Sequence, residues 1–297
     1  MRPYDKPDFL PMPFPLQVFR DAKTNRSPIA MVSLYDAPTA ALCCDAGVDI
    51  LLVGDSMGNT ILGLDNTVAV SMSDIAHHTE AVARGVRSSQ RPQVPVVADL
   101  PFGSYATKKL AARNGAKLMR RGAHCVKLEG AGQSALEAVR VLIEMGAPVM
   151  GHIGYTPQSA LHFAGALQGK TALDAARLLD EAKALESAGC CALLLEMMPY
   201  EVAQRITREM AIATVGIGAG ASCDGQVLVW HDLTGLSLGK PFRFAKRYAE
   251  ARELLLQAAR EFVGEVHESE FPTAQHGWQM TESERELWRD SDSNDGA

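Results

Sequence analysis

The chain has 297 residues, of which 47% are hydrophobic and 22% charged, and its formal net charge at pH 7 is −6. This composition is typical of a globular protein that buries a sizeable core, and it excludes a largely disordered chain. With 29 basic residues against 35 acidic ones, the chain has no obvious basic face to neutralise phosphates. We therefore expect no nucleic-acid partner.

Residues 1–27 are predicted to form an extended arm and a short helix. Five prolines among the first 15 residues block regular helix and sheet, and residues 16–23 then suit a helix. No apolar run reaches the roughly 18 residues of a membrane helix. The N-terminus also lacks the basic stretch and apolar core of a signal peptide. The sequence therefore predicts a cytoplasmic protein without a membrane segment.

The six cysteines include two adjacent pairs and no C-x-x-C motif. Most lie in apolar or helical surroundings, which favours buried free thiols in a reducing compartment over disulfides or a zinc site.

From residue 29 onward, short apolar runs alternate with amphipathic segments of helix length. This pattern is typical of parallel strands that are buried on both faces. Eight strands are predicted, at 29–34, 50–53, 94–100, 125–128, 148–152, 192–195, 213–217 and 227–230. Helices are predicted at 37–46, 73–85, 107–121, 133–145, 172–188 and 200–210. Eight such units favour a closed (β/α)8 TIM barrel over an open doubly wound sheet.

The C-terminal region continues with a helical stretch at 243–264, which we expect to cap the barrel or pack on a neighbouring subunit. The catalytic domain is thus predicted to span 28–264. Residues 265–297 are acidic and polar, and we expect a mostly disordered tail there.

Ionisable residues follow five consecutive predicted strands. Barrel enzymes place their catalytic groups at the carboxyl ends of the strands. One acid at such a position more often caps the next helix, but six groups converging on one mouth predict an active site. They are Asp55, Asp99, Lys127, Glu129, His152 and Glu196.

Three carboxylates in this set, with a small hydroxyl beside them and no Cys or His pair at ligand spacing, favour a hard cation that keeps its waters. Magnesium fits this better than zinc. Lys127 and Glu129 lie two residues apart on one strand and so face the same way, toward the barrel axis in the expected register. A buried Lys–Glu pair that merely satisfies itself is the alternative, although its desolvation is costly.

Two further candidates each have a structural and a catalytic interpretation. His152 lies between Gly151 and Ile153-Gly154, where ligand or backbone can approach closely, but a lone histidine is often structural. Glu196 follows four apolar residues, which places it at the rim of a hydrophobic strand as a candidate general base. Its alternative is a carboxylate at the start of the next helix.

Two loops are expected near the same mouth. The segment GIGAG at 216–220 lacks G-x-G-x-x-G spacing, so a close-approach loop for a flat or bulky ligand fits as well as a phosphate loop. Residues 160–170 are long for a βα loop and are predicted to act as a lid.

Taken in order, these motifs resemble the ketopantoate hydroxymethyltransferase family from about residue 28 to 249. The matching segments are VGDSMG at 53–58, ADLPF at 98–102, VKLEG at 126–130, GHIGYTPQ at 151–158, LE at 195–196, GIGAG at 216–220 and DGQ at 224–226. The resemblance implies a barrel of the phosphoenolpyruvate mutase-like group that assembles as a homodecamer.

The resemblance also implies an activity and roles for the site residues. The reaction would transfer a hydroxymethyl group from 5,10-methylenetetrahydrofolate to 3-methyl-2-oxobutanoate, with Mg²⁺ holding the 2-oxo acid. Glu196 would be the base. The metal would lie among Asp55, Asp99 and Glu129, and the substrate contacts would come from Asp55, Ser56, Asp99, Lys127 and His152.

Three positions depart from the family pattern. The chain has LGL at 62–64 where the family has Gln-Gly-His, Ser33 where it has Thr, and AGALQG at 164–169 where it has Gly-Tyr-Lys-Val-Gln-Gly. The first and third changes affect the loops over the mouth, and all three leave the metal ligands intact. Two alternatives stay open: a magnesium-dependent C–C lyase of the same barrel group that needs no folate, and a catalytically silent barrel.

Overall fold

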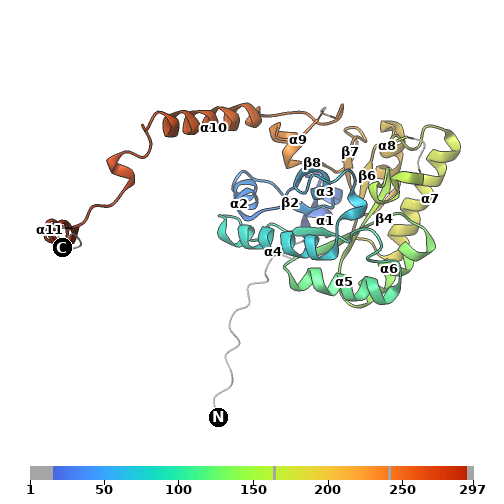
Figure 1. The fold of residues 1–297 in the computed structure, drawn as a ribbon. Coiled ribbons are helices and arrows are strands. Elements are labelled where there is room, and N and C mark those ends of the chain that lie inside the picture. The colour runs from blue at the N-terminus through green and yellow to red at the C-terminus, as the bar shows by residue number, and fades with distance from the viewer. Residues whose placement is uncertain (1–15, 163–164, 240–241, 293–297) are drawn as a thin grey trace, which may run out of the picture. The chain divides into compact units, whose positions relative to one another are not determined.

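The computed structural model describes residues 16–162, 165–239 and 242–292, and it divides into one unit spanning Met1–Tyr248 and a second spanning Ala249–Ala297. The first unit contains a closed barrel of eight parallel strands, each paired with the next along the chain and the last with the first (Figure 1). The strands are β1 Ile29–Ser33, β2 Ile50–Val53, β3 Val96–Asp99, β4 Cys125–Glu129, β5 Val149–Gly154, β6 Ala192–Glu196, β7 Ala213–Ile217 and β8 Gly225–Val229. The predicted (β/α)8 barrel is confirmed.

Helices of the first unit connect the strands and surround the barrel (Figure 1). Asp36, Ser71, Thr107 and Thr171 cap four of them by accepting a hydrogen bond from a main-chain N–H of the first turn. The helices are α1 Gln17–Asn25, α2 Ala37–Asp45, α3 Met57–Thr60, η1 Thr67–Ala69, α4 Met72–Ser88, α5 Lys108–Arg120, α6 Gln133–Glu144, η2 Pro157–His162, α7 Ala172–Ala188, α8 Tyr200–Glu209 and α9 Trp230–Thr234.

The strands separate two apolar clusters. One fills the barrel interior and includes Met31, Ile50 and Met150, and the other lies between the strands and the helices and includes Val53 and Leu128. Every residue of β2 to β5 and β7 is buried, as the continuous apolar runs indicate.

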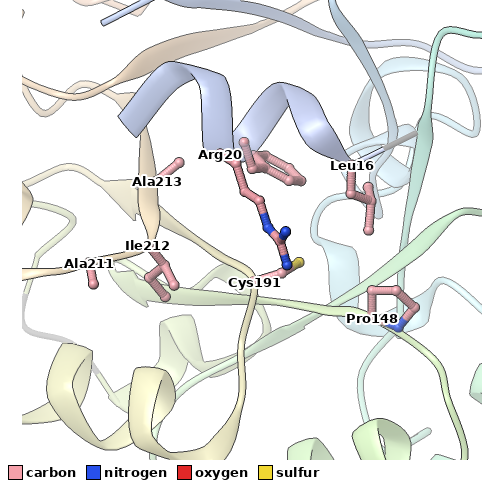
Figure 2. Close-up of a pocket in the computed structure, with 8 residues that line it drawn as sticks. Leu16, Arg20, Pro148, Cys191, Ala211, Ile212 and Ala213 are labelled. Carbon is pink, nitrogen blue, oxygen red and sulfur yellow. The ribbon is translucent and has the colours of Figure 1, made fainter. Parts of the chain in front are cut away.

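The helix α1 closes the end of the barrel at which the strands begin, which we call the floor. Phe19 and Ala22 of this helix are buried against the interior cluster. Beside them lies a cavity of about 300 Å³, in which Leu16 and Arg20 face Pro148, Cys191 and Ile212 (Figure 2). These last three residues precede β5, β6 and β7, so the cavity belongs to the amino ends of the strands.

All six cysteines are free thiols, as predicted, and four of them are buried. Within the ranges that the structure describes, no helix is long and apolar enough to cross a membrane.

The C-terminal region differs from the prediction. The last long helix, α10 Ala251–His267, starts eight residues later than the predicted start at 243 and belongs to the second unit. The reason is local, because Phe244 packs against the interior cluster and stacks with Phe242 at 5.2 Å between ring centroids. Burial of this aromatic side chain competes with a helical course.

The second unit continues with η3 Ala274–His276 and α11 Glu282–Asp292. Within the tail that is predicted to be mostly disordered, the structure forms a helix at 282–292. The disorder of this tail stays a prediction. The proline-rich extended arm predicted at 1–15 and residue 164 of the family departure lie outside the described residues.

Candidate active site

Seven side chains predicted from the sequence line one cavity at the carboxyl ends of the strands. Its volume is about 470 Å³. Strands β2 to β6 position these side chains, because the carboxyl ends of parallel strands meet at one mouth of a barrel. The seven residues are Asp55, Ser56, Asp99, Lys127, Glu129, His152 and Glu196. The structure therefore brings the whole predicted set together.

Asp99 connects two parts of this set. It is paired in register with Lys127 of β4, and its Oδ1 lies 2.8 Å from Lys127 Nζ. Its Oδ2 accepts a hydrogen bond of 3.0 Å from the main-chain N–H of Asp55. Burial lowers the pKa of Lys127, but Asp99, Glu129 and Asp55 outweigh that effect and raise it, so the ammonium keeps its proton.

His152 lies between two carboxylates. Its Nδ1 is 3.4 Å from Glu129 Oε1 and its Nε2 is 3.3 Å from Glu196 Oε2. Burial lowers the pKa of His152, but the contacts with Glu129 and Glu196 together raise it to about 9. Burial raises the pKa of Glu129, and His152 and Lys127 lower it below its usual value. At neutral pH His152 is therefore an imidazolium in contact with the side chains of Glu129 and Glu196.

The site carries oxygen ligands that suit a hard divalent cation. Among the described residues no three His, Cys, Asp or Glu side chains form a ready metal cluster. Mg²⁺ does not need one, because it keeps several waters and takes one or two carboxylates. Burial, Asp99 and Glu129 raise the pKa of Asp55 well above its usual value, which indicates buried negative charge without a sufficient counter-charge. Asp55 and Asp99, with Glu129 nearby, fit such a cation.

A group of hydroxyls lies beside the acids. Ser56 Oγ is 2.8 Å from the Tyr35 hydroxyl and 3.4 Å from Ser33 Oγ. A side chain at Gly54 would approach both serine oxygens to 3.0 Å, so this glycine allows the close packing. Ser33 also lines the cavity, which places one of the three departures from the family pattern inside the site.

The other two departures lie in loops, and only the second of them contributes a residue to the cavity. Residues 62–64 do not line the cavity, although Asn59, Thr60 and the neighbouring 65–67 do. In the predicted lid, Ala160 and Ala166 line the cavity. Ile217 of the glycine-containing loop also lines it, so that loop lies at the mouth as expected.

Two kinds of residue were missed from the sequence. One is the buried Gln158 with the partly buried Tyr105, to which it is hydrogen-bonded, and the only signal for Gln158 was its place in the segment after His152. The other is an apolar wall that includes Met197, Phe242 and Phe244. Phe244 was predicted to lie at the start of a helix at 243–264 and Phe242 just before it, so their place in the cavity had no sequence signal.

The buried ionisable groups of this chain lie at the carboxyl ends of its strands, where barrel enzymes place their catalytic groups. The fold and the site therefore place the chain in the class of (β/α)8-barrel enzymes. Solved structures with the same fold include 2,3-dimethylmalate lyase, described as a PEP mutase/isocitrate lyase superfamily member, with a TM-score of 0.55 at 16% identity, covering 94% of this chain and 99% of that one. Another is phosphonopyruvate hydrolase, with a TM-score of 0.58 at 12% identity, covering 94% and 96%. These likenesses show the fold of the phosphoenolpyruvate mutase-like group.

The particular family follows from sequence comparison. The model of the ketopantoate hydroxymethyltransferase family matches residues 14–274. Relatives named 3-methyl-2-oxobutanoate hydroxymethyltransferase are 47% identical in Thermotoga sp. (strain RQ2), over 86% of this chain and 93% of the relative, and 45% identical in Pyrobaculum aerophilum, over 86% and 96%. The chain belongs to the ketopantoate hydroxymethyltransferase family.

Proposed function

We propose that the chain transfers a hydroxymethyl group from 5,10-methylenetetrahydrofolate to 3-methyl-2-oxobutanoate, giving 2-dehydropantoate for pantothenate and coenzyme A biosynthesis. One observation carries the proposal. A carboxylate that is 18% exposed, Glu196, faces the same cavity as the buried Asp55, Asp99 and Lys127. A base and an anion-stabilising group are what removal of a proton beside a ketone requires.

Glu196 is the proposed base. The imidazolium of His152 already carries its proton at neutral pH, because its pKa is raised to about 9 by the contacts with Glu129 and Glu196 that outweigh burial. His152 therefore holds the carboxylate of Glu196 in place instead of accepting the substrate proton. Glu196 takes the proton from C3 of the 2-oxo acid, and the resulting carbanion attacks the methylene carbon of the folate as one of that carbon's two C–N bonds breaks. Water then hydrolyses the remaining C–N bond, which supplies the hydroxyl group and releases tetrahydrofolate.

The remaining residues would bind and polarise the 2-oxo acid. Asp55, Asp99 and Glu129 are the proposed magnesium ligands, and Ser56, Lys127 and His152 are proposed substrate contacts together with the two aspartates. When bound, Mg²⁺ would supply positive charge beside the ketone oxygen, where negative charge develops. Lys127 adds a second, permanent positive charge from the protein.

The proposal extends to setting and assembly. We infer a cytoplasmic homo-oligomer, and the family resemblance favours a decamer, which analytical ultracentrifugation tests. The apolar wall with Phe242 and Phe244 suits the flat pterin of the folate, because aromatic faces stack on planar rings.

Proton NMR of 3-methyl-2-oxobutanoate in D₂O tests the activity. With Mg²⁺ and the enzyme we expect loss of the C3 proton signal without folate, and a new hydroxymethylene signal when methylenetetrahydrofolate is added. If the C3 proton signal persists and no hydroxymethylene signal appears, the proposal fails. Cleavage of a 2-oxo or 2-hydroxy acid without folate would favour the lyase alternative.

A further inference from the structure

Gln158 connects two of the acids in the site. It lies in η2, just after β5, and is 5% exposed. Its side-chain Nε2 donates hydrogen bonds to Asp55 Oδ2 at 2.8 Å and to the Leu100 carbonyl at 3.0 Å. Its main-chain N–H donates to Glu129 Oε2 at 3.0 Å. One residue thus contacts the groups that follow β2 and β3 and the end of β4.

The orientation of this amide is determined by its partners. The Tyr105 hydroxyl donates a hydrogen bond of 2.8 Å to Gln158 Oε1. A flipped amide would direct Oε1 at Asp55 Oδ2 and the Leu100 carbonyl, which both accept hydrogen bonds from Nε2 in the structure. It would also turn the amide nitrogen toward the Tyr105 hydroxyl. Tyr105 and the two acceptors therefore favour the same single orientation.

Among the three proposed metal ligands, this arrangement leaves one carboxylate oxygen open. Glu129 Oε1 faces His152 and its Oε2 accepts from Gln158, while Asp99 Oδ1 lies beside Lys127 and its Oδ2 accepts from Asp55. Asp55 Oδ2 is held by Gln158. For Asp55 Oδ1 the described part of the chain supplies no hydrogen-bond partner, and Asp55 lines the cavity.

We propose that Gln158 is a positioning residue that holds Asp55 with Oδ1 directed at the cavity and keeps Glu129 against His152, and that Tyr105 acts through Gln158. The inference rests on the proposed function, in which Asp55 binds a divalent cation. A neutral amide suits this task, because it orients a carboxylate without cancelling the charge that a cation needs. Partners that orient a metal ligand typically contribute about 10- to 100-fold to metal affinity.

Binding of Mn²⁺ without any substrate tests the inference, measured by electron paramagnetic resonance and isothermal titration calorimetry. We expect Gln158→Leu to weaken Mn²⁺ binding about 10- to 100-fold. Tyr105→Phe should weaken it less, because the amide remains. In the described part of the chain the Tyr105 hydroxyl makes no hydrogen bond with Asp55, and its contacts with Glu129 are to the main chain of that residue. The double variant should therefore bind like Gln158→Leu alone. Gln133→Leu, an exposed glutamine on α6, is the matched control and should bind like the parent.

The outcomes separate the two proposals. Parental Mn²⁺ affinity in Gln158→Leu would overturn the positioning role and leave the proposed function standing. Additive losses in the double variant would overturn the route through Gln158. If the parent itself binds no Mn²⁺, the metal-dependent function fails, and the inference fails with it. Should Gln158→Leu not fold, as judged by circular dichroism, Tyr105→Phe carries the test, and unchanged Mn²⁺ affinity there would refute the proposal.

Discussion

The two ends of the barrel are built on the same strands and have opposite chemistry. At the amino ends, Cys125 and Cys191 lie near each other with 3.8 Å between their sulfur atoms, and Cys191 lines the cavity beside α1 (Figure 2). At the carboxyl ends of the same two strands lie Glu129 and Glu196, around a cavity of about 470 Å³. On β4 the change from a thiol to an ammonium takes two residues, from Cys125 to Lys127.

This difference separates stability from chemistry. Burial of Phe19 and its apolar neighbours at the floor stabilises the fold by removing apolar area from water. Burial of Asp55, Asp99 and Lys127 at the mouth costs desolvation free energy, which pairing only partly offsets. Substitutions at the mouth should therefore change turnover more than stability, and substitutions at the floor should do the reverse.

Among single substitutions, the largest effect on turnover is expected at Glu196. Glu196→Gln removes the proposed base but keeps the size of the side chain. Exchange of the C3 proton into D₂O should fall about 10²- to 10⁴-fold even without folate, as for loss of a general base. Proton NMR measures this exchange, and binding of Mg²⁺ and of the 2-oxo acid should stay close to the parental values.

The control for this change is Glu201→Gln, an exposed carboxylate on α8. It should leave exchange unchanged. If Glu196→Gln keeps parental exchange while hydroxymethyl transfer falls, Glu196 acts on the folate side or in positioning, and another group becomes the base.

Loss of the metal is expected to come next. Chelation by EDTA should abolish activity and added Mg²⁺ should restore it. Asp55→Ala or Asp99→Ala should lower kcat/KM about 10²- to 10³-fold, the range for loss of one charge-stabilising group, while circular dichroism shows a folded protein. Asp180→Ala, an exposed position on α7, is the control. Full activity in metal-free buffer would contradict the metal assignment.

At the floor the effect should move from turnover to stability. Phe19→Ala leaves a cavity between α1 and the interior cluster, and we expect it to lower the free energy of unfolding by about 3–5 kcal/mol. At temperatures where the variant stays folded, kcat should match the parent. Arg20→Ala, exposed on the same helix, should change stability by less than about 0.5 kcal/mol. A fall in kcat for folded Phe19→Ala would show that the two ends are coupled.

The smallest effect is expected in the second unit. Deletion of residues 270–297 should leave turnover within about threefold, because exposed terminal segments usually tolerate change. The helix α11 has 11 residues, and isolated helices shorter than about 12–15 residues are marginal in water. Its amides should therefore exchange rapidly in hydrogen–deuterium exchange, and strong protection would indicate a docked tail.

The sequence alone determined the barrel and the seven predicted side chains at its mouth. Short apolar runs can be recognised one at a time, and a polar residue at the end of such a run is visible without knowledge of its neighbours. Because all strands of a parallel barrel end at the same mouth, Asp55, Asp99 and Glu196 could be grouped from chain position alone. The family resemblance added their roles, which local patterns did not contain.

Only the tertiary structure decided which of these groups touch. The 2.8 Å bond between Gln158 and Asp55 joins residues 103 positions apart, and the register of β3 on β4 sets Asp99 beside Lys127. Phe244 lies in the cavity and not in a helix, because burial against the barrel interior outweighs local helix propensity. Such contacts depend on packing between distant segments, and a single residue's neighbours in the chain carry no record of them.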